Sequence, residues 1–206
     1  LVDKAHSLGL KVMIDWVANH TGCDNVWVEQ HPEWYEYDNG KFVSPWDWTD
    51  TYSLDYDNKE MRAAMVDVMK FWSTEVGVDG FRCDVAFLVP VEFWDSARVE
   101  LEKVKPVFML AEASEKELTD KAFDAVYNWP LLFLLDNIYK GSNSVGDLID
   151  LADKQLIDLA PDAYYMNHIT NHDRNTWDGT EFERYGKAVK SFAVMTYVWP
   201  GMPLIY

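Results

Sequence analysis

The chain has 206 residues, of which 49% are hydrophobic, and its 18 basic and 35 acidic side chains give a formal net charge of −17. This share of apolar residues is enough for a folded core and excludes wholesale disorder. The strong negative charge argues against nucleic acid or an anionic membrane surface as a partner. The longest apolar run, 192–206, contains two prolines and a glycine, so we expect no transmembrane helix.

The cysteines and the chain ends bear on compartment and completeness. No signal-peptide pattern opens the sequence. Cys23 and Cys83 are too few for a disulfide framework, so we expect free thiols and leave the compartment open. Residues 1–8 have the pattern of the last turns of a helix, and the chain stops on an apolar, strand-like run. We therefore expect a piece of a longer protein.

Short apolar strands alternate with helical patterns along the chain. Strands are predicted at 11–15, 80–84, 107–111, 125–129 and 163–169, with a sixth at the end, and helices at 58–76, 90–104, from 114, 146–159 and 180–199. Asn58 and the segment that begins at Thr180 are predicted caps, and Ser114 begins a predicted capping box. This alternation predicts an α/β fold with a parallel sheet, either doubly wound or a (β/α)₈ barrel. No Gly-x-Gly-x-x-Gly motif follows a strand, which weakens the nucleotide-binding version.

A long loop at 21–57 follows the first predicted strand. Loops of this length are uncommon and usually functional. This one interleaves carboxylates with the aromatic residues Trp27, Trp34, Tyr35, Tyr37, Phe42, Trp46, Trp48, Tyr52 and Tyr56. Two interpretations are open: the rings form a small core that holds the loop together, or one or two of them, such as Trp46 or Trp48, face a sugar-binding cleft.

Polar residues cluster where the predicted strands end, at the edge where parallel α/β folds place their active sites. They are Asp15, Asn19, His20, Arg82, Asp84, Glu112, Asn171, His172 and Asp173. Strand periodicity puts Arg82 and Asp84 on one face. The guanidinium keeps the neighbouring carboxylate ionised, as a nucleophile requires, although a purely structural ion pair has the same pattern.

Glu112 ends an apolar strand. Partial desolvation there favours the protonated form of a general acid, although Glu112 could instead help to cap the helix that begins near Ser114. Two carboxyl groups in such contrasting environments are typical of glycoside hydrolysis. A weaker alternative is a metal site, with Asp15, His20, His172 and Asp173 as its ligands.

Four segments, in order and each at a strand end, resemble the signatures of the α-amylase superfamily of glycoside hydrolases. They are 15–20, 80–84, 110–113 and 169–173, which match the ends of the third, fourth, fifth and seventh barrel strands. The resemblance implies a (β/α)₈ barrel that is incomplete within 1–206, with the third to eighth strands present. It also implies that 21–57 is a short inserted domain B. Open sheet edges would then pair with another copy, so we expect self-association.

The resemblance also implies roles. Asp84 would be the nucleophile, Glu112 the general acid and then base, and Asp173 the third carboxylate; the substrate-binding residues would be His20, Arg82 and His172. The implied activity is retaining hydrolysis of α-glucosidic bonds in starch-like α-glucans or maltooligosaccharides, with the Asp84 and Glu112 carboxyls roughly 5 Å apart.

One departure from the family pattern concerns the positions after Asp84. Many members carry Lys-His where this chain has Phe87-Leu88. The resemblance therefore does not carry over the leaving-group contact or the calcium site associated with those residues, and only Asn19 with carboxylates of the loop leaves calcium binding open. No cofactor and no metal ligand is assigned.

Three other functions are open. A transglycosylase or isomerase would use the same residues, and analysis of anomers and acceptors would separate it from a hydrolase. A non-catalytic glucan-binding relative is disfavoured because all three carboxylates are present. The chain could also be an inactive piece of an active enzyme.

Overall fold

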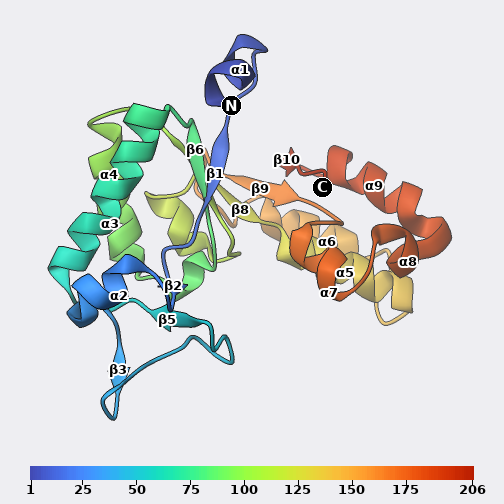
Figure 1. The fold of residues 1–206 in the computed structure, drawn as a ribbon. Helices are drawn as coiled ribbons and strands as arrows, with labels where there is room; N and C mark the ends of the chain where they lie inside the picture. Colours follow the sequence, from blue (N-terminus) through green and yellow to red (C-terminus); the bar gives the residue numbers. More distant parts are fainter. The chain divides into compact units, whose positions relative to one another are not determined.

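The computed structural model describes residues 1–206 and divides them into two compact units. Unit 1 comprises Leu1–Glu112 and Lys121–Phe123, and unit 2 comprises Ala113–Asp120 and Asp124–Tyr206. Each unit contains parallel strands and helices of its own (Figure 1).

Three parallel strands form the centre of unit 1. They are β1 (Met13–Trp16), β6 (Gly80–Cys83) and β7 (Phe108–Ala111), and β6 pairs with both others. Gly80 is required at the start of β6, because a Cβ there would lie 2.3 Å from the Phe108 carbonyl oxygen. The parallel arrangement brings the carboxyl ends of all three strands to one edge.

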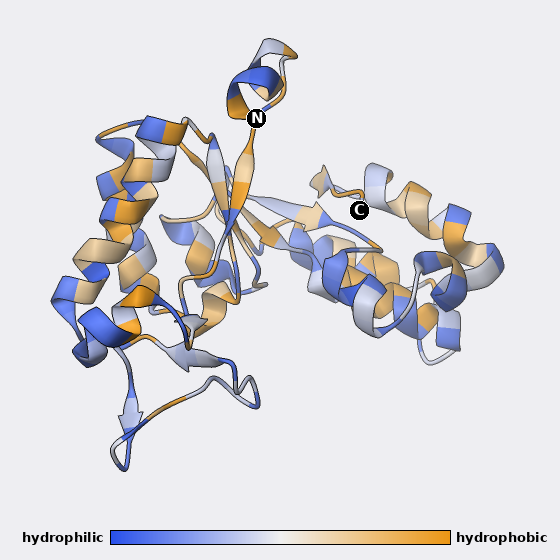
Figure 2. Ribbon diagram, in the orientation of Figure 1, coloured by the Kyte–Doolittle hydropathy of each residue, from blue (hydrophilic) through white to orange (hydrophobic).

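Helices α1 (Val2–Ser7), α3 (Lys59–Phe71) and α4 (Val91–Glu102) belong to unit 1, and α3 and α4 lie side by side (Figure 1). The Asn58 side chain caps α3 as predicted, and a π-helical turn, Trp72–Val76, extends it to Gly77 in the left-handed region. Both hydrophilic and hydrophobic residues occur along α3 and α4 (Figure 2). Met61, Met65, Val66 and Met69 of α3 are buried, whereas Val68 and Trp72 are half-buried.

The segment 21–57 has short elements of its own. Strand β2 (His20–Gly22) pairs antiparallel with β5 (Thr51–Ser53), and β3 (Tyr37–Asp38) pairs antiparallel with β4 (Lys41–Phe42). Along the chain, α2 (Val26–Gln30) and the 3₁₀ turn Pro32–Trp34 lie between β2 and β3. Trp34 and Tyr35 are 7% and 2% exposed, whereas Trp46 is 60% exposed. Some of the rings therefore form a small core, and others face solvent.

Unit 2 contains three further parallel strands. Strand β9 (Tyr164–Asn167) pairs with both β8 (Ala125–Tyr127) and β10 (Met202–Pro203). The helices are α5 (Trp129–Lys140), α6 (Asp147–Gln155), α7 (His172–Trp177), α8 (Glu181–Tyr185) and α9 (Val189–Val198). None of the helices in the structure is long and apolar enough to span a membrane.

Several predictions for unit 2 need correction. Helices α5 and α7 were not expected, and the predicted strand 125–129 ends at Tyr127 because Asn128 caps α5 through the Leu131 amide. The predicted helix 180–199 is two helices, broken at Gly186, although its Thr180 capping box is present. The helix expected from 114 is a 3₁₀ turn, Lys116–Asp120, and the Ser114 hydroxyl donates to the Tyr127 carbonyl.

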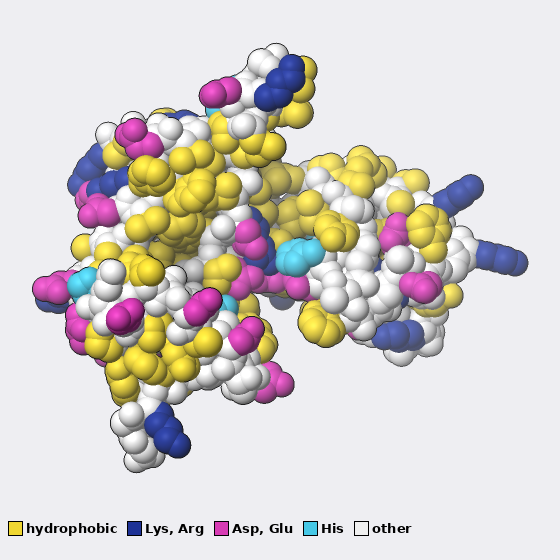
Figure 3. All heavy atoms as spheres, in the orientation of Figure 1, with side chains coloured by type: hydrophobic (Ala, Val, Ile, Leu, Met, Phe, Trp, Pro, Cys, Tyr) yellow, Lys and Arg dark blue, Asp and Glu magenta, His cyan; other side chains and the backbone are white.

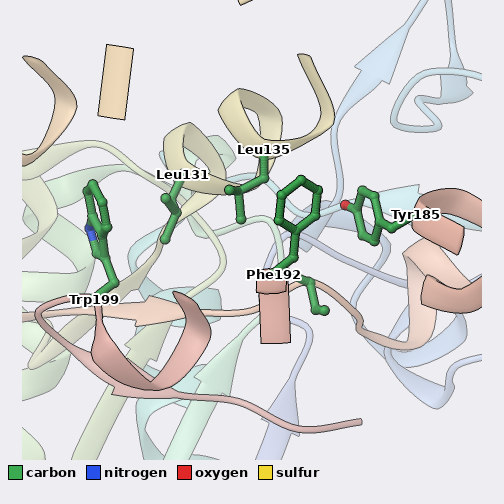
Figure 4. Close-up of a cluster of buried hydrophobic side chains, with 6 residues drawn as sticks. Leu131, Leu135, Tyr185, Phe192 and Trp199 are labelled. Atoms are coloured by element: carbon green, nitrogen blue, oxygen red, sulfur yellow. The ribbon is translucent and has the colours of Figure 1, made fainter. Parts of the chain in front are cut away.

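The core of unit 2 is formed by side chains of α5, α8 and α9 (Figure 4). Leu131 and Leu135 of α5 pack against Phe192 of α9 and Tyr185 of α8, and Trp199 follows α9. The Tyr185 and Phe192 rings meet edge to face with centroids 5.0 Å apart. This cluster positions the helices that surround the end of β9.

A buried histidine makes the stability of unit 2 dependent on pH. His168 is 1% exposed and contacts the Tyr127 and Trp129 rings edge-on. Burial lowers its pKa from 6.5 to about 4. Between these values the unfolded chain binds more protons than the folded chain, so lowering the pH from 6.5 to 4 destabilises the fold.

We expect the His168 titration to remove roughly 3 kcal/mol from the free energy of unfolding over this interval. In His168→Gln the pH dependence should shrink by about this amount. Denaturant unfolding of both proteins between pH 4 and 7 measures it. Parallel curves for the two proteins would show that His168 does not titrate in this interval.

Candidate active site

Three carboxylates meet one guanidinium at the carboxyl ends of β1, β6 and β7. Arg82 Nη1 lies 2.9 Å from Asp15 Oδ1 and 2.6 Å from Asp84 Oδ1, and Arg82 Nη2 lies 2.9 Å from Glu112 Oε1. The side chains of Arg82, Glu112 and Asp84 are 8%, 12% and 22% exposed, and that of Asp15 is 53% exposed. The cluster therefore opens to solvent on the Asp15 side.

The sheet itself brings these groups together. Arg82 pairs with Asp15 in the β1–β6 register and with Leu110 in the β6–β7 register. Two backbone hydrogen bonds continue the ladders past the strand ends, from the Asp84 amide to the Trp16 carbonyl and from the Glu112 amide to the Cys83 carbonyl. Cys83, between the two charged residues, is fully buried, as expected for the opposite face of the strand.

A strained residue fixes one end of Glu112. Val85 has φ 36° and ψ 45°, a left-handed conformation that is a strong outlier for a β-branched side chain. In this conformation its backbone amide donates a 2.8 Å hydrogen bond to Glu112 Oε2. The two carboxyl oxygens of Glu112 therefore contact Arg82 and the backbone of Val85. Sequence reasoning missed Val85, because nothing in its residue type signals this geometry.

His20 lies beside this cluster, at the start of β2. Its ring packs against Trp48 with centroids 5.3 Å apart, and its Nδ1 lies 3.3 Å from the Asn19 amide nitrogen. Burial lowers the pKa of His20, against the opposing effect of the Asp84 and Asp50 carboxylates. The ring is therefore neutral at neutral pH and is able both to donate and to accept a hydrogen bond.

The remaining predicted residues lie in unit 2. His172 and Asp173 form the first turn of α7, where the Asn171 side chain accepts a hydrogen bond from the Arg174 amide. His172 Nε2 lies 3.2 Å from Asp173 Oδ2, and both side chains are nearly half exposed. The structure thus arranges the six predicted residues in two groups: His20, Arg82, Asp84 and Glu112 in unit 1, and His172 and Asp173 in unit 2.

A buried ion network supports α7. Arg174 of α7 donates to Asp136 of α5, which also accepts a hydrogen bond from the Tyr185 hydroxyl of α8. Arg174 also lies 2.7 Å from the exposed Asp178 carboxylate. Within each unit, no group of three or more His, Cys, Asp or Glu side chains is arranged to hold a metal ion. The three carboxylates at the strand ends of unit 1 instead pair with Arg82.

Comparison with known proteins identifies the family. The family model described as "Alpha amylase, catalytic domain" matches residues 30–206. The chain therefore belongs to the alpha-amylase family of glycoside hydrolases, which confirms the resemblance drawn from the four strand-end motifs.

Individual relatives agree with this assignment. A maltogenic alpha-amylase from Bacillus acidopullulyticus is 28% identical to this chain. The match extends over 234 aligned residues and covers 100% of this chain and 39% of that protein. The crystal structure of an alpha-amylase from Lactobacillus plantarum is 32% identical with a TM-score of 0.89, covering 100% of this chain and 52% of that chain. The crystal structure of a maltogenic alpha-amylase from Thermotoga neapolitana has the same identity and TM-score and covers 99% of this chain and 48% of that chain.

The expected fold class is confirmed: the fold is α/β and forms part of a (β/α)₈ barrel. The chain spans about half the length of these solved relatives and 39% of the curated one.

Proposed function

We propose that the protein is a retaining glycoside hydrolase that cleaves α-glucosidic bonds in starch-like α-glucans or maltooligosaccharides. The observation that carries this proposal is the pairing of Asp84 and Glu112 with the two terminal nitrogens of one buried guanidinium. This arrangement holds two carboxyl groups side by side, and closely spaced carboxyl groups are the requirement for double displacement.

In the first step the Asp84 carboxylate attacks the anomeric carbon of the sugar. The bond from that carbon to the glycosidic oxygen breaks as the carboxylic acid form of Glu112 gives its proton to the departing oxygen. Arg82 stabilises the attacking carboxylate and orients it. The product is a covalent glycosyl ester on Asp84, with Glu112 left ionised next to the Arg82 guanidinium.

In the second step Glu112 takes a proton from a water molecule, which attacks the anomeric carbon and releases Asp84. Two inversions restore the original configuration of the sugar. His20, His172 and Asp173 would bind hydroxyls of the same sugar, and these contacts contribute to the rate where they strengthen in the oxocarbenium-like transition state.

Two further observations support the substrate class. Relatives named maltogenic alpha-amylase and alpha-amylase are similar over the whole chain. The net charge of −17 disfavours anionic ligands and leaves neutral sugars as suitable ones. If a sugar replaced water as the acceptor, the same residues would carry out transglycosylation, and lengthened oligosaccharides among the products would reveal it.

The test is the release of reducing sugar from soluble starch and maltoheptaose by the purified protein. We expect Asp84→Asn to lower the rate at least about a thousandfold, because the amide cannot form the ester. Asp67→Asn makes the same chemical change on α3, where the carboxylate is 77% exposed, and should leave the rate unchanged.

The anomer first released, followed by NMR, should be the α form. Equal rates for Asp84→Asn and the parent, or release of the β anomer, would contradict the assignment of Asp84 as nucleophile. If the parent protein released sugar from neither soluble starch nor maltoheptaose, the hydrolase proposal would be overturned.

A further inference from the structure

An exposed group of aromatic rings lies next to the carboxylate cluster of unit 1. Trp46 is 60% exposed and Phe87 is 47% exposed. The Trp46 ring meets the half-buried Trp48 ring edge-on at 4.6 Å and the Phe87 ring at 6.4 Å. Around segment 21–57, at the lower left of Figure 3, hydrophobic side chains are interleaved with acidic ones.

The backbone holds Trp46 in this exposed position. Trp46 has φ 49°, in the left-handed region that non-glycine residues rarely occupy. The turn around it is closed by hydrogen bonds from the Trp48 amide to the Pro45 carbonyl and from the Thr51 hydroxyl to the Trp48 carbonyl. The left-handed backbone of Trp46 costs free energy of folding, and the indole, 60% exposed, recovers little of it through burial. This combination points to a binding role.

The rings connect to the catalytic groups from two directions. Trp48 packs against His20, whose ring senses the charge of Asp84. Phe87 lies in the 3₁₀ turn Ala86–Leu88, three residues after Asp84 along the chain. Segment 21–57 and the turn after β6 therefore meet through the Trp46–Phe87 contact beside the place where the proposed reaction occurs.

We propose that Trp46 and Phe87 form an aromatic platform on which the α-glucan stacks the glucosyl units next to the one that is cleaved. This inference rests on the proposed function and deepens it. One face of a glucopyranose ring carries C–H groups, which pack against a flat aromatic surface, while its hydroxyls remain in water. Stacking needs no charge on the ligand, which suits a neutral glucan. The platform selects chains of several glucosyl units over single sugars.

Binding of maltoheptaose, measured by titration calorimetry, tests the platform. All proteins carry Asp84→Asn, so that the ligand stays intact. We expect Trp46→Ala to weaken the affinity about tenfold, and Phe87→Ala to weaken it less because its ring is smaller. Trp46→Phe keeps a flat ring and should recover most of the affinity. Phe71→Ala is the matched control, since Phe71 is 51% exposed on α3, outside the platform.

The outcomes separate the two proposals. If the Asp84→Asn protein binds maltoheptaose and the added Trp46→Ala change alters the affinity by less than twofold, the platform is wrong while the proposed function stands. If the Asp84→Asn protein binds no maltoheptaose and the parent releases no sugar, the proposed function fails as well. Circular dichroism of each variant shows whether a loss of binding comes from unfolding. If Trp46→Ala fails to fold, Phe87→Ala decides the matter, because an unchanged affinity in that variant would also contradict the platform.

Discussion

Arg82→Met should lower the free energy of unfolding by about 3 kcal/mol and reduce kcat by at least about a hundredfold. Arg82 is 7% exposed and faces Asp15, Asp84 and Glu112. Without the guanidinium, two largely buried carboxylates repel each other and lose their charged partner. Protonation of Asp84 would relieve the repulsion but remove the proposed nucleophile, and without its contact to Arg82 the Asp84 carboxyl group is no longer held in one orientation.

Two variants sharpen this test. Arg82→Lys keeps the charge, but a single ammonium group cannot place separate donors on two carboxylates, so an intermediate loss is expected. Arg62→Met, which removes an arginine lying over the Phe93 ring 5.8 Å away, should leave kcat unchanged. Denaturant unfolding and starch hydrolysis measure both effects. A stable Arg82→Met protein with normal kcat would show that Arg82 neither supports the fold nor positions Asp84.

The second large effect is expected at Asp136 in unit 2. Its side chain is 10% exposed and accepts hydrogen bonds from Arg174 of α7 and Tyr185 of α8. Asp136→Asn keeps the shape but removes the charge opposite Arg174, which should cost about 3 kcal/mol of stability. Because α7 begins with His172 and Asp173, activity should fall even where the variant is still folded.

The matched control is Asp178→Asn, which removes the other carboxylate of Arg174. Asp178 is 43% exposed, so solvent screens the pair and the expected cost is below about 1 kcal/mol. Thermal and denaturant unfolding of the two variants side by side measure the difference. Similar losses from both would mean that burial of Asp136 does not determine the strength of the network.

The residues around Arg82 show why part of this structure was predictable. Strand periodicity alone placed Arg82 and Asp84 on one face with Cys83 on the other, and the parallel strand pattern placed Glu112 at the same edge. These inferences depend only on the two-residue repeat of a strand and on strand direction. Four short motifs then identified the family and hence the barrel.

Other features depend on contacts that a local pattern does not contain. Helix α5 was missed although Asn128 and Pro130 begin it and Gly141 ends it, because its apolar first turns continue directly from β8. The predicted helix 180–199 is broken at Gly186, and a single glycine within a helical pattern does not by itself signal a break. The left-handed backbone of Val85 accompanies a hydrogen bond to Glu112, a residue 27 positions away, and a β-branched residue has no local preference for this conformation.

The two cysteines differ in a way that makes the protein chemically addressable. Cys83 is enclosed between the strand and the helices, and burial raises the pKa of its thiol, so little reactive thiolate forms there. Cys23 is exposed at the start of the segment that carries Trp46 and Trp48. A maleimide dye added to the unmodified protein therefore attaches at one place. That single label tests whether the aromatic segment responds to added glucan, with no cysteine to remove or introduce.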